Sequence, residues 1–414
     1  MNKPWRSGII FTAINFLTGL GNLAFQIVLG HHLKAQGQYS QANSAINGLM
    51  PMLSLVPLVA VFTVTHYIAH FKAIGDSGRL QGLLAGCRRF LFHVTLIGSA
   101  LAVAAIKPLS IFFHYSLGLM LATLLFTLVG LWTSLATALC QGLAWFYRLA
   151  LLGFLAMLLR VSFGWLITLH WPSPQTAVLA STFGLLAYVL LLAWRREIAV
   201  KAEPVSPWNH EFILYLVVST AVVVGQYCFM NSDLMVMQRY FTAADGDAYV
   251  GAERLAVSLP ITVAPLLTVL FTHRSSGHTS RALREQLELV GLYTFGLTCG
   301  AVCLLFLRTF CLKLIFGGHV PPAAAAMIKP LALTMVFVGL LQAISTWALA
   351  SRWSKVAVTF GILGLIYWIV ILTAGRTPAS LLRAMPIASA IALLILAVVW
   401  FYTLKRHSKI AQPV

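Results

Sequence analysis

Acidic residues are scarce in this chain, and charged residues as a whole are few. The 414 residues include only 10 Asp and Glu, and charged side chains make up 9% of the sequence. Soluble domains contain about 25% charged residues, because their surface needs a polar shell. The shortage therefore excludes an ordinary soluble globular protein.

Disulfide frameworks and the familiar catalytic motifs are also missing. The six cysteines occur mostly within apolar segments, and Cys299 and Cys303 have no His or carboxylate beside them at metal-ligand spacing, which favours packing over metal binding. The sequence contains no P-loop, no His and carboxylate metal cluster and no Ser-His-Asp pattern at credible positions. A membrane-bound polysaccharide polymerase or ligase would need a large loop outside the membrane to hold its acceptor, and the sequence contains no such loop. We expect neither an enzyme nor a bound cofactor.

Long apolar stretches are abundant in this chain. Hydrophobic residues make up 60% of the sequence, and the mean hydropathy is +0.88. Stretches such as 117–139 and 387–404 supply roughly 20 apolar residues each, enough to cross a bilayer core as helices. The sequence predicts an all-α polytopic membrane protein with about twelve transmembrane helices, at roughly 8–30, 41–70, 88–106, 117–140, 148–169, 175–194, 211–238, 249–272, 286–307, 325–350, 356–374 and 380–403. Pro57 and Pro265 should kink the second and eighth spans.

The basic residues predict the orientation of these spans. With the N-terminus placed in the cytoplasm, eighteen Lys and Arg fall in cytoplasmic segments and nine in outer segments, while Arg160 lies within the fifth span. This excess predicts that both termini are cytoplasmic. The net charge of +18 then reflects topology and contact with anionic membrane lipids, and the loops are too short for a nucleic-acid-binding domain.

The two halves of the chain share an order of residues, which indicates a duplication. Asn22, Tyr39 and Pro57 recur as Asn231, Tyr249 and Pro265, at offsets of 209, 210 and 208 residues. We therefore predict an N-terminal six-helix lobe (1–197), a cytoplasmic linker (198–210) and a C-terminal six-helix lobe (211–414). Six spans per copy relate the lobes by an axis along the membrane normal, as in many transporters.

Polar residues concentrate on the first, second, seventh and eighth spans. At about 100° per residue they form stripes on single helix faces, and a charged group facing lipid is costly to insert. The candidate cavity residues are Asn15, Asn22, Gln26, Asn43, Asn47, Arg160, Asn231, Asp233, Gln238, Arg239, Glu253 and Arg254. Two alternatives stay open: the amides can bond helix to helix, and Arg239 can reach the outer headgroups instead.

The segment "NSDLMVMQRYFTAADGDAYVGAERL" carries a family resemblance. It resembles the seventh-helix region of polysaccharide flippases, with Asn231, Asp233, Gly246, Tyr249 and Ala252 at the matching positions. The opening segment "GNLAFQIVLGHHLKAQGQYSQANSAINGL" is similar, although Lys34 and Gln36 replace acidic residues in its turn. The chain thus resembles the Wzx-like (O-antigen) flippases of the multidrug, oligosaccharidyl-lipid and polysaccharide (MOP) exporter superfamily.

This resemblance implies a fold and a function. The fold is two six-helix lobes around a central cavity, in the cytoplasmic (inner) membrane of a bacterium. The implied cargo is a polyprenyl-pyrophosphate-linked oligosaccharide, which alternating access moves from the cytoplasmic to the periplasmic leaflet for surface polysaccharide biosynthesis. Coupling of this transport to a proton or sodium gradient, through Asp233 or Glu253, is left open. We expect a monomer, with a polysaccharide polymerase or export machinery as the protein partner that this role implies.

A drug or cation antiporter of the MATE type in the same superfamily is the alternative. It would share the fold and the repeats. Its cavity would more typically carry acidic groups for a cationic cargo, and this chain is poor in them.

Overall fold

Long helices make up the protein, as the sequence predicts. The computed structural model describes residues 4–194, 210–275, 281–318 and 320–410, and no strand occurs among them. The first half contains α1 (Pro4–His32), α2 (Gln38–Asn43), the π-helix η1 (Ser44–Leu49), α3 (Met50–Leu53), α4 (Leu55–Ile74), α5 (Ser77–Phe113), α6 (Leu117–Gly142), α7 (Phe146–His170) and α8 (Pro174–Trp194). The second half contains α9 (His210–Tyr240), α10 (Ala243–Ser275), α11 (Arg281–Phe316), α12 (Ala324–Ala350), α13 (Ser354–Ala374) and α14 (Pro378–Ile410).

The lengths and composition of these helices are those of a multi-pass membrane protein. Among the described residues, ten helices are long and apolar enough to cross a bilayer, and the bent pair 38–53 and 58–74 provides an eleventh. The 21-residue α8 occupies the place of the predicted sixth span. Two helices are much longer than predicted: α5 has 37 residues and α11 has 36. The prediction counted only their apolar parts, whereas the polar residues at their ends also form helix.

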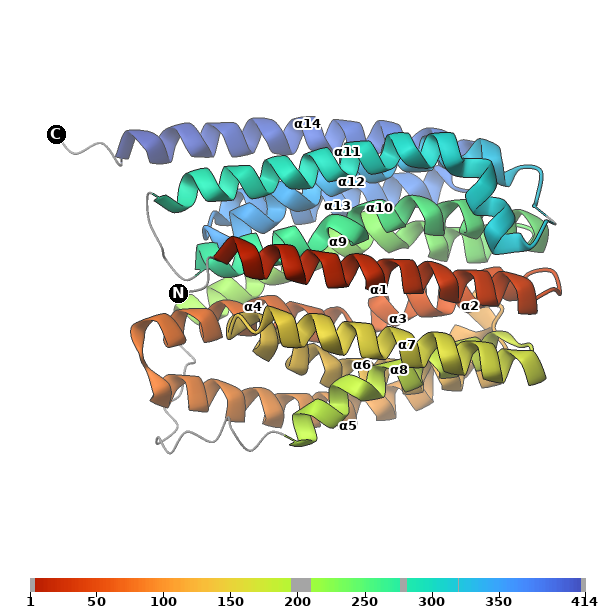
Figure 1. Ribbon diagram of the computed structural model, residues 1–414, viewed down its shortest axis with the longest axis horizontal. Coiled ribbons are helices and arrows are strands. Elements are labelled where there is room, and N and C mark those ends of the chain that lie inside the picture. Colours follow the sequence, from red (N-terminus) through yellow and green to blue (C-terminus); the bar gives the residue numbers. More distant parts are fainter. Residues whose placement is uncertain (1–3, 195–209, 276–280, 319, 411–414) are drawn as a thin grey trace.

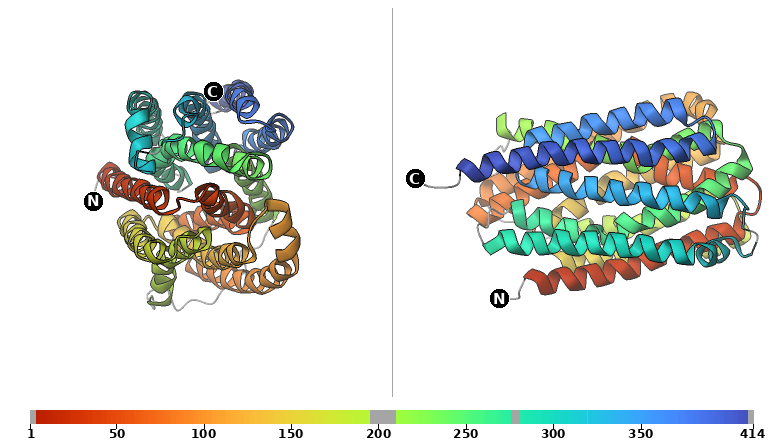
Figure 2. Two further views of the ribbon diagram at one scale, coloured as in Figure 1. Left: turned by 90° about the vertical axis from the view of Figure 1, so that its right-hand side faces the viewer. Right: turned by 90° about the horizontal axis from the view of Figure 1, so that it is seen from above.

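The two halves of the chain form two lobes that lie side by side. Figure 1 and the end-on view in Figure 2 place α9–α14 on one side of the bundle and most of α1–α8 on the other, with both termini at the same end. In the first half α1 packs on α7, α4 on α6, α6 on α8 and α7 on α8; in the second half α9 packs on α13, α10 on α12, α12 on α14 and α13 on α14. Under the predicted repeat these are equivalent pairs. The boundaries at 197 and 211 stay a prediction, since all of the linker but His210 lies outside the described residues.

The second span is broken, whereas its counterpart is not. Between Gln38 and Ile74 the chain passes from α2 through the π-helix η1 and α3 into α4, and its two parts are bent by 58°. Ser54, at φ −97° and ψ 11°, interrupts the helix three residues before Pro57, which has no N–H to bond the preceding turn. In the other lobe α10 continues through Pro260 and Pro265 as one helix. The predicted kink at Pro57 therefore lies at a break in the second span, whereas the helix continues without a break at Pro265; a bend at Pro265 stays a prediction.

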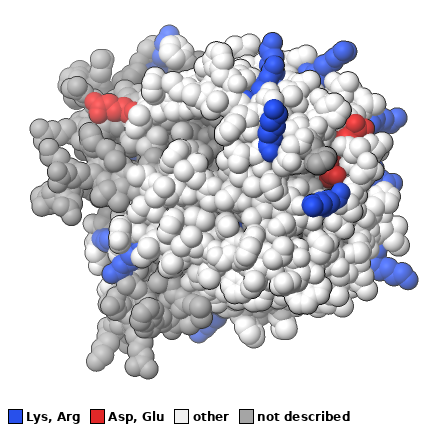
Figure 3. Space-filling model, turned by 45° about the vertical axis from the view of Figure 1, so that its right-hand side comes forward, with Lys and Arg blue, Asp and Glu red and all other residues white. Residues whose placement is uncertain are grey.

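The surface of the bundle is apolar along its length. Large side chains such as Phe306 and Leu394 are 84% and 68% exposed, which fits contact with lipid rather than water. Figure 3 shows broad uncharged surface, with most visible Lys and Arg side chains toward the end of the bundle opposite the termini. Buried polar side chains lie inside the bundle, both within each lobe and where the lobes meet.

Candidate functional site between the lobes

Amide side chains on the first two spans form one hydrogen-bonded network. Gln26 on α1 donates to Asn43 Oδ1 at 3.0 Å and accepts from the Tyr39 hydroxyl at 2.9 Å. Asn47 donates to the same Asn43 oxygen at 3.2 Å, and Asn43 donates to the Tyr39 carbonyl at 3.1 Å. Gln26 and Asn43 are buried. Three predicted residues are thus brought together, in contacts that also satisfy the helix-to-helix alternative.

Arg160 is a partly buried cation on α7 that faces α1. Its Nη1 donates to Asn22 Oδ1 at 3.2 Å, and its guanidinium carbon lies 4.1 Å from the centroid of the Phe25 ring, a cation–π contact. Its Nε is buried without a hydrogen-bond partner. Gly184 allows this arrangement, because a Cβ there would lie 3.0 Å from Arg160 Cβ and 2.7 Å from the Ala156 carbonyl oxygen. Among the described residues, no carboxylate forms an ion pair with Arg160.

The two predicted carboxylates of the second lobe have different partners. Glu253 is fully buried and forms a two-point ion pair with Arg254, its neighbour on α10. Asp233 on α9 is 1% exposed and accepts from the Tyr249 hydroxyl at 2.6 Å, while its Oδ1 has no partner. An unpaired carboxylate oxygen in such a place is available for a cation or a proton.

These groups act as one cluster across the lobe interface. Arg254 lies within electrostatic range of Arg160 in the other lobe, and of Asp233 and Tyr39. Arg160 is on α7, which packs on α1, and α1 packs on α10, which carries Glu253 and Arg254. We call Arg160, Asp233, Glu253 and Arg254 the central charged cluster. Its two guanidinium groups are the kind of donor that binds phosphate or carboxylate.

Gln238 and Arg239 lie away from this cluster, near the ends of α9 and α5. Gln238 accepts from the Ser44 hydroxyl at 3.0 Å and donates to the Phe113 carbonyl at 3.1 Å, so it joins the two lobes. Arg239 is exposed, donates to the Phe112 carbonyl at 3.2 Å and lies over the Phe112 ring. This position fits the alternative that Arg239 reaches the membrane interface.

Asn15 and Asn231 are half-buried and lie at the margin of the site. Asn15 precedes Asn22 by about two helical turns on α1, toward the end that holds the termini. Asn231 lies two residues before Asp233, and at about 100° per residue the two point to different faces of α9.

Asp247 is an interface residue that the sequence reasoning missed. Its carboxylate accepts from the backbone N–H of Gly37 and of Ser40, both at 2.8 Å, and so joins α10 to the start of α2 in the other lobe. Gly37 has φ +83°, a conformation that other residues rarely adopt, which presents these N–H groups together. The signal was the Asp-Gly-Asp turn at 245–247, which contributed to the family resemblance but was not considered as a contact.

The lobes also touch near the opposite end of the bundle, where the termini lie. Arg352, between α12 and α13, donates to His66 Nε2 on α4 at 3.3 Å through Nε, and the His66 ring stacks on Tyr215 of α9 at 4.3 Å. His66 is buried, at 2% exposed. Contacts therefore close the lobe interface on both sides of the central charged cluster.

No group of three or more His, Cys, Asp or Glu side chains in the described part of the chain could hold a metal ion.

Comparison with known proteins finds likeness in structure but not in sequence. No protein-family model matches the chain, and no curated protein matches it. A crystal structure of MATE in complex with MaD3S has a TM-score of 0.69 and 12% identity, covering 99% of this chain and 98% of that one. The chain has the fold of the MATE transporters. An outward-facing multidrug resistance MATE family transporter of the MOP superfamily gives the same TM-score, identity and coverage.

An inward-facing MATE structure is also similar, with a TM-score of 0.65 and 12% identity over 98% of this chain and all of that one. At this identity the likeness describes the fold alone. The description of the central charged cluster therefore rests on this chain's own residues and not on the MATE structures.

Proposed function

We propose that this protein is a flippase that carries a polyprenyl-pyrophosphate-linked oligosaccharide from the cytoplasmic to the periplasmic leaflet. The observation that carries the proposal is Arg160, a partly buried cation in an apolar helix, without a carboxylate partner among the described residues and within electrostatic range of Arg254 in the other lobe. Two guanidinium groups in this region favour an anionic cargo such as pyrophosphate. Placing a cation in an apolar helix without a counter-ion is costly, and its Nε is buried without a partner, so a binding role is a reason for it to be there.

The neighbouring groups suit the other parts of this cargo. The amides of Gln26, Asn43 and Asn47 and the hydroxyl of Tyr39 can exchange their mutual hydrogen bonds for bonds to sugar hydroxyls. The polyprenyl tail needs no binding groups, because it stays in the bilayer beside the gap between the lobes. The protein then acts as a transporter and makes or breaks no covalent bond.

Movement of the cargo requires that the two sides of the interface open alternately. The Asp247 contact would break for opening on one side and the Arg352–His66 contact for opening on the other. With both termini in the cytoplasm, as the charge distribution predicts, Asp247 closes the periplasmic side.

Asp247→Ala is expected to open the periplasmic side more often, because it removes two hydrogen bonds to a charged acceptor, each worth about 1.5–3 kcal/mol. The labelling rate of a cysteine at position 45, by an impermeant maleimide added outside, should rise about tenfold. Asp245→Ala is the matched control, since Asp245 lies in the first turn of α10 and, in the part of the chain that the structure describes, its carboxylate bonds to Thr242 just before that helix. Equal labelling in the two variants would show that Asp247 does not hold this side closed.

Asp233 is the residue we propose for coupling transport to a proton or sodium gradient. Its unpaired Oδ1 is buried beside the Tyr249 contact. Asp233→Asn should therefore make transport insensitive to an imposed pH gradient or sodium gradient, while the protein still inserts into the membrane. Normal gradient dependence in Asp233→Asn would exclude ion carriage by this residue.

A MATE-like antiporter of small molecules is the second candidate. The fold supports it directly, since the solved structures that match are MATE transporters. The buried carboxylates of Asp233 and Glu253 are also suited to cation exchange. A resistance profile of an expressing strain distinguishes it: protection against a panel of cationic drugs would favour this candidate.

The decisive experiment is a mass-spectrometric profile of lipid-linked oligosaccharides in the native host with and without the gene. A complete polyprenyl-linked repeat unit that accumulates in the cytoplasmic leaflet would establish flipping and identify the cargo. An unchanged profile with normal surface glycan would favour the small-molecule exporter.

We further propose that the protein acts as a monomer in the bacterial inner membrane. The oligosaccharide that it moves would then be passed to a polysaccharide polymerase or export machinery.

A further inference from the structure

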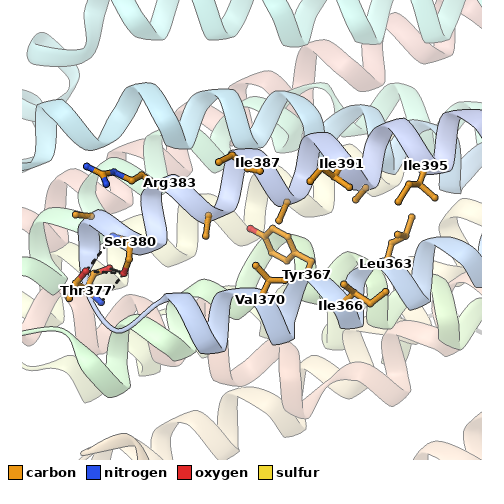
Figure 4. A pocket seen from close by; sticks show the side chains of 14 residues that line it. Leu363, Ile366, Tyr367, Val370, Thr377, Ser380, Arg383, Ile387, Ile391 and Ile395 are labelled. Atoms are coloured by element: carbon orange, nitrogen blue, oxygen red, sulfur yellow. Dashed lines mark hydrogen bonds between the residues drawn. The ribbon is translucent and has the colours of Figure 1, made fainter.

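A groove lies on the second lobe, between α13 and α14, and of its lining residues Tyr367 is within electrostatic range of Asp233 in the central charged cluster. It has a volume of about 720 Å³, and aliphatic side chains line most of it. Ile366, Ile387 and Ile391 on its walls are 51%, 61% and 54% exposed. Figure 4 shows these side chains along the two helices. In a multi-pass membrane protein such a groove faces lipid chains.

One end of the groove is polar and positively charged. Arg383 lines this end and is exposed, and it has no ion-pair or hydrogen-bond partner among the described residues. Thr377 and Ser380 lie beside it, but their hydroxyls bond to each other at 2.8 Å and cap the start of α14. Arg383 is thus the group at this end that is available for an anion.

Tyr367 provides a second polar group, deeper in the groove. It is 2% exposed, and its buried hydroxyl has no hydrogen-bond partner. Its ring packs on Phe229 of α9 with centroids 4.8 Å apart, which fixes its direction. In Figure 4 the ring reaches from α13 toward α14, with its hydroxyl in the groove on the side of Arg383. A buried donor without a partner is costly, so this hydroxyl points to an acceptor from a ligand.

The length of the groove corresponds to one leaflet. From Arg383 to Ile395, its last lining residue on α14, the helix rises by roughly 18 Å. The hydrocarbon core of a bilayer is about 30 Å thick, so the groove extends about halfway across it. The charged end lies at the side of the bundle opposite the two termini (Figure 1).

We propose that this groove binds one anionic glycerophospholipid from the leaflet opposite the termini. The groove offers, in order, a guanidinium, a hydroxyl donor and an aliphatic channel. A glycerophospholipid offers a phosphate, an ester carbonyl and an acyl chain in the same order, and each meets its complement. A polyprenyl phosphate has no ester carbonyl and would leave the Tyr367 hydroxyl unpaired. The occupant is thus a membrane lipid and not the transported one, and the proposal does not depend on the proposed function.

Native mass spectrometry of the full-length protein in detergent, titrated with palmitoyl-oleoyl phosphatidylglycerol, tests this. One lipid should bind, and Arg383→Gln should bind it roughly tenfold more weakly, through loss of a charge-assisted contact. Tyr367→Phe should weaken it severalfold without loss of stability, since no bond within the protein is removed. Ala388→Phe should block the groove. Arg376→Gln is the matched control, because Arg376 is exposed in the connection between α13 and α14, at the same end of the groove, but does not line it.

Three results would overturn the proposal. The first is equal lipid affinity in Arg383→Gln and Arg376→Gln, which would mean that Arg383 only contacts the headgroup region nonspecifically. The second is binding of inorganic phosphate alone that competes with the lipid, which would make the site a free-anion site. The third is tighter binding of undecaprenyl phosphate that needs Arg383 but not Tyr367, which would assign the groove to a polyprenyl lipid. Arg383 is exposed, so its variant tests the idea even if Ala388→Phe disturbs packing.

Discussion

Arg160→Gln is expected to reduce transport at least about tenfold while the protein still folds and inserts. Glutamine keeps a donor for Asn22 but removes the charge and the contact with the Phe25 ring. Charge-assisted hydrogen bonds contribute about 1.5–3 kcal/mol each, and about 1.4 kcal/mol corresponds to a factor of ten. The readout is accumulation of the lipid-linked intermediate in the cytoplasmic leaflet of cells that carry the variant.

The control for this variant lies on the same helix. Arg148 on α7 is exposed and lies over Trp145, so Arg148→Gln should transport normally. Arg160→Lys keeps the charge but loses the planar guanidinium group, so its transport activity should lie between those of the unmodified protein and Arg160→Gln. If Arg160→Gln and Arg254→Gln are both fully active, these arginines do not bind the cargo, and the anionic-cargo argument fails with them.

Glu253→Ala should cause the largest loss of stability. It leaves the guanidinium of Arg254, 8% exposed, without its ion-pair partner. Breaking a buried pair by removal of one member costs about 3–5 kcal/mol, because the other charge stays buried. We expect a clear drop in the melting temperature of the purified protein, followed by fluorescence-detected size exclusion after heating. Asp233 is within electrostatic range of Arg254 and should offset part of this loss.

A double variant separates the ion pair from the cavity that the truncation leaves. Glu253→Ala with Arg254→Met removes both charges and should recover most of the lost stability, since the cost comes from the unpaired charge. A double variant as unstable as Glu253→Ala alone would attribute the loss to packing instead.

The sequence predicted the fold better than the details of the helices. Long apolar runs specify transmembrane helices, because lipid offers the backbone no other hydrogen-bond partner. Their ends were harder to place: Ser77 and Arg281 begin helices well before the apolar stretch starts, since helix formation continues into polar segments. The π-helix at Ser44–Leu49 was not predictable from the spacing of polar residues, because that spacing was interpreted on the geometry of a regular α-helix.

The candidate site was predictable where polar side chains stood out against apolar neighbours. Gln26, Asn43 and Arg160 were noticed for that reason, and the structure joins Gln26 to Asn43 and Arg160 to Asn22. Their partners were not predictable, because Asn22 is 138 residues from Arg160. Asp247 was missed since it lies in a turn, where an acidic residue is unremarkable until the other lobe is placed beside it.

The broken second span gives the two lobes different mechanical properties. The second span has a 58° bend and a π-helical turn, whereas α10, which faces the same interface, runs unbroken through both of its prolines. Tyr39, Asn43 and Asn47 all lie on the short arm before the bend. Asp247 bonds this arm to α10, so a movement of the arm alone would reach the other lobe through that contact. The two halves of the chain would then respond differently although their helices pack in equivalent pairs.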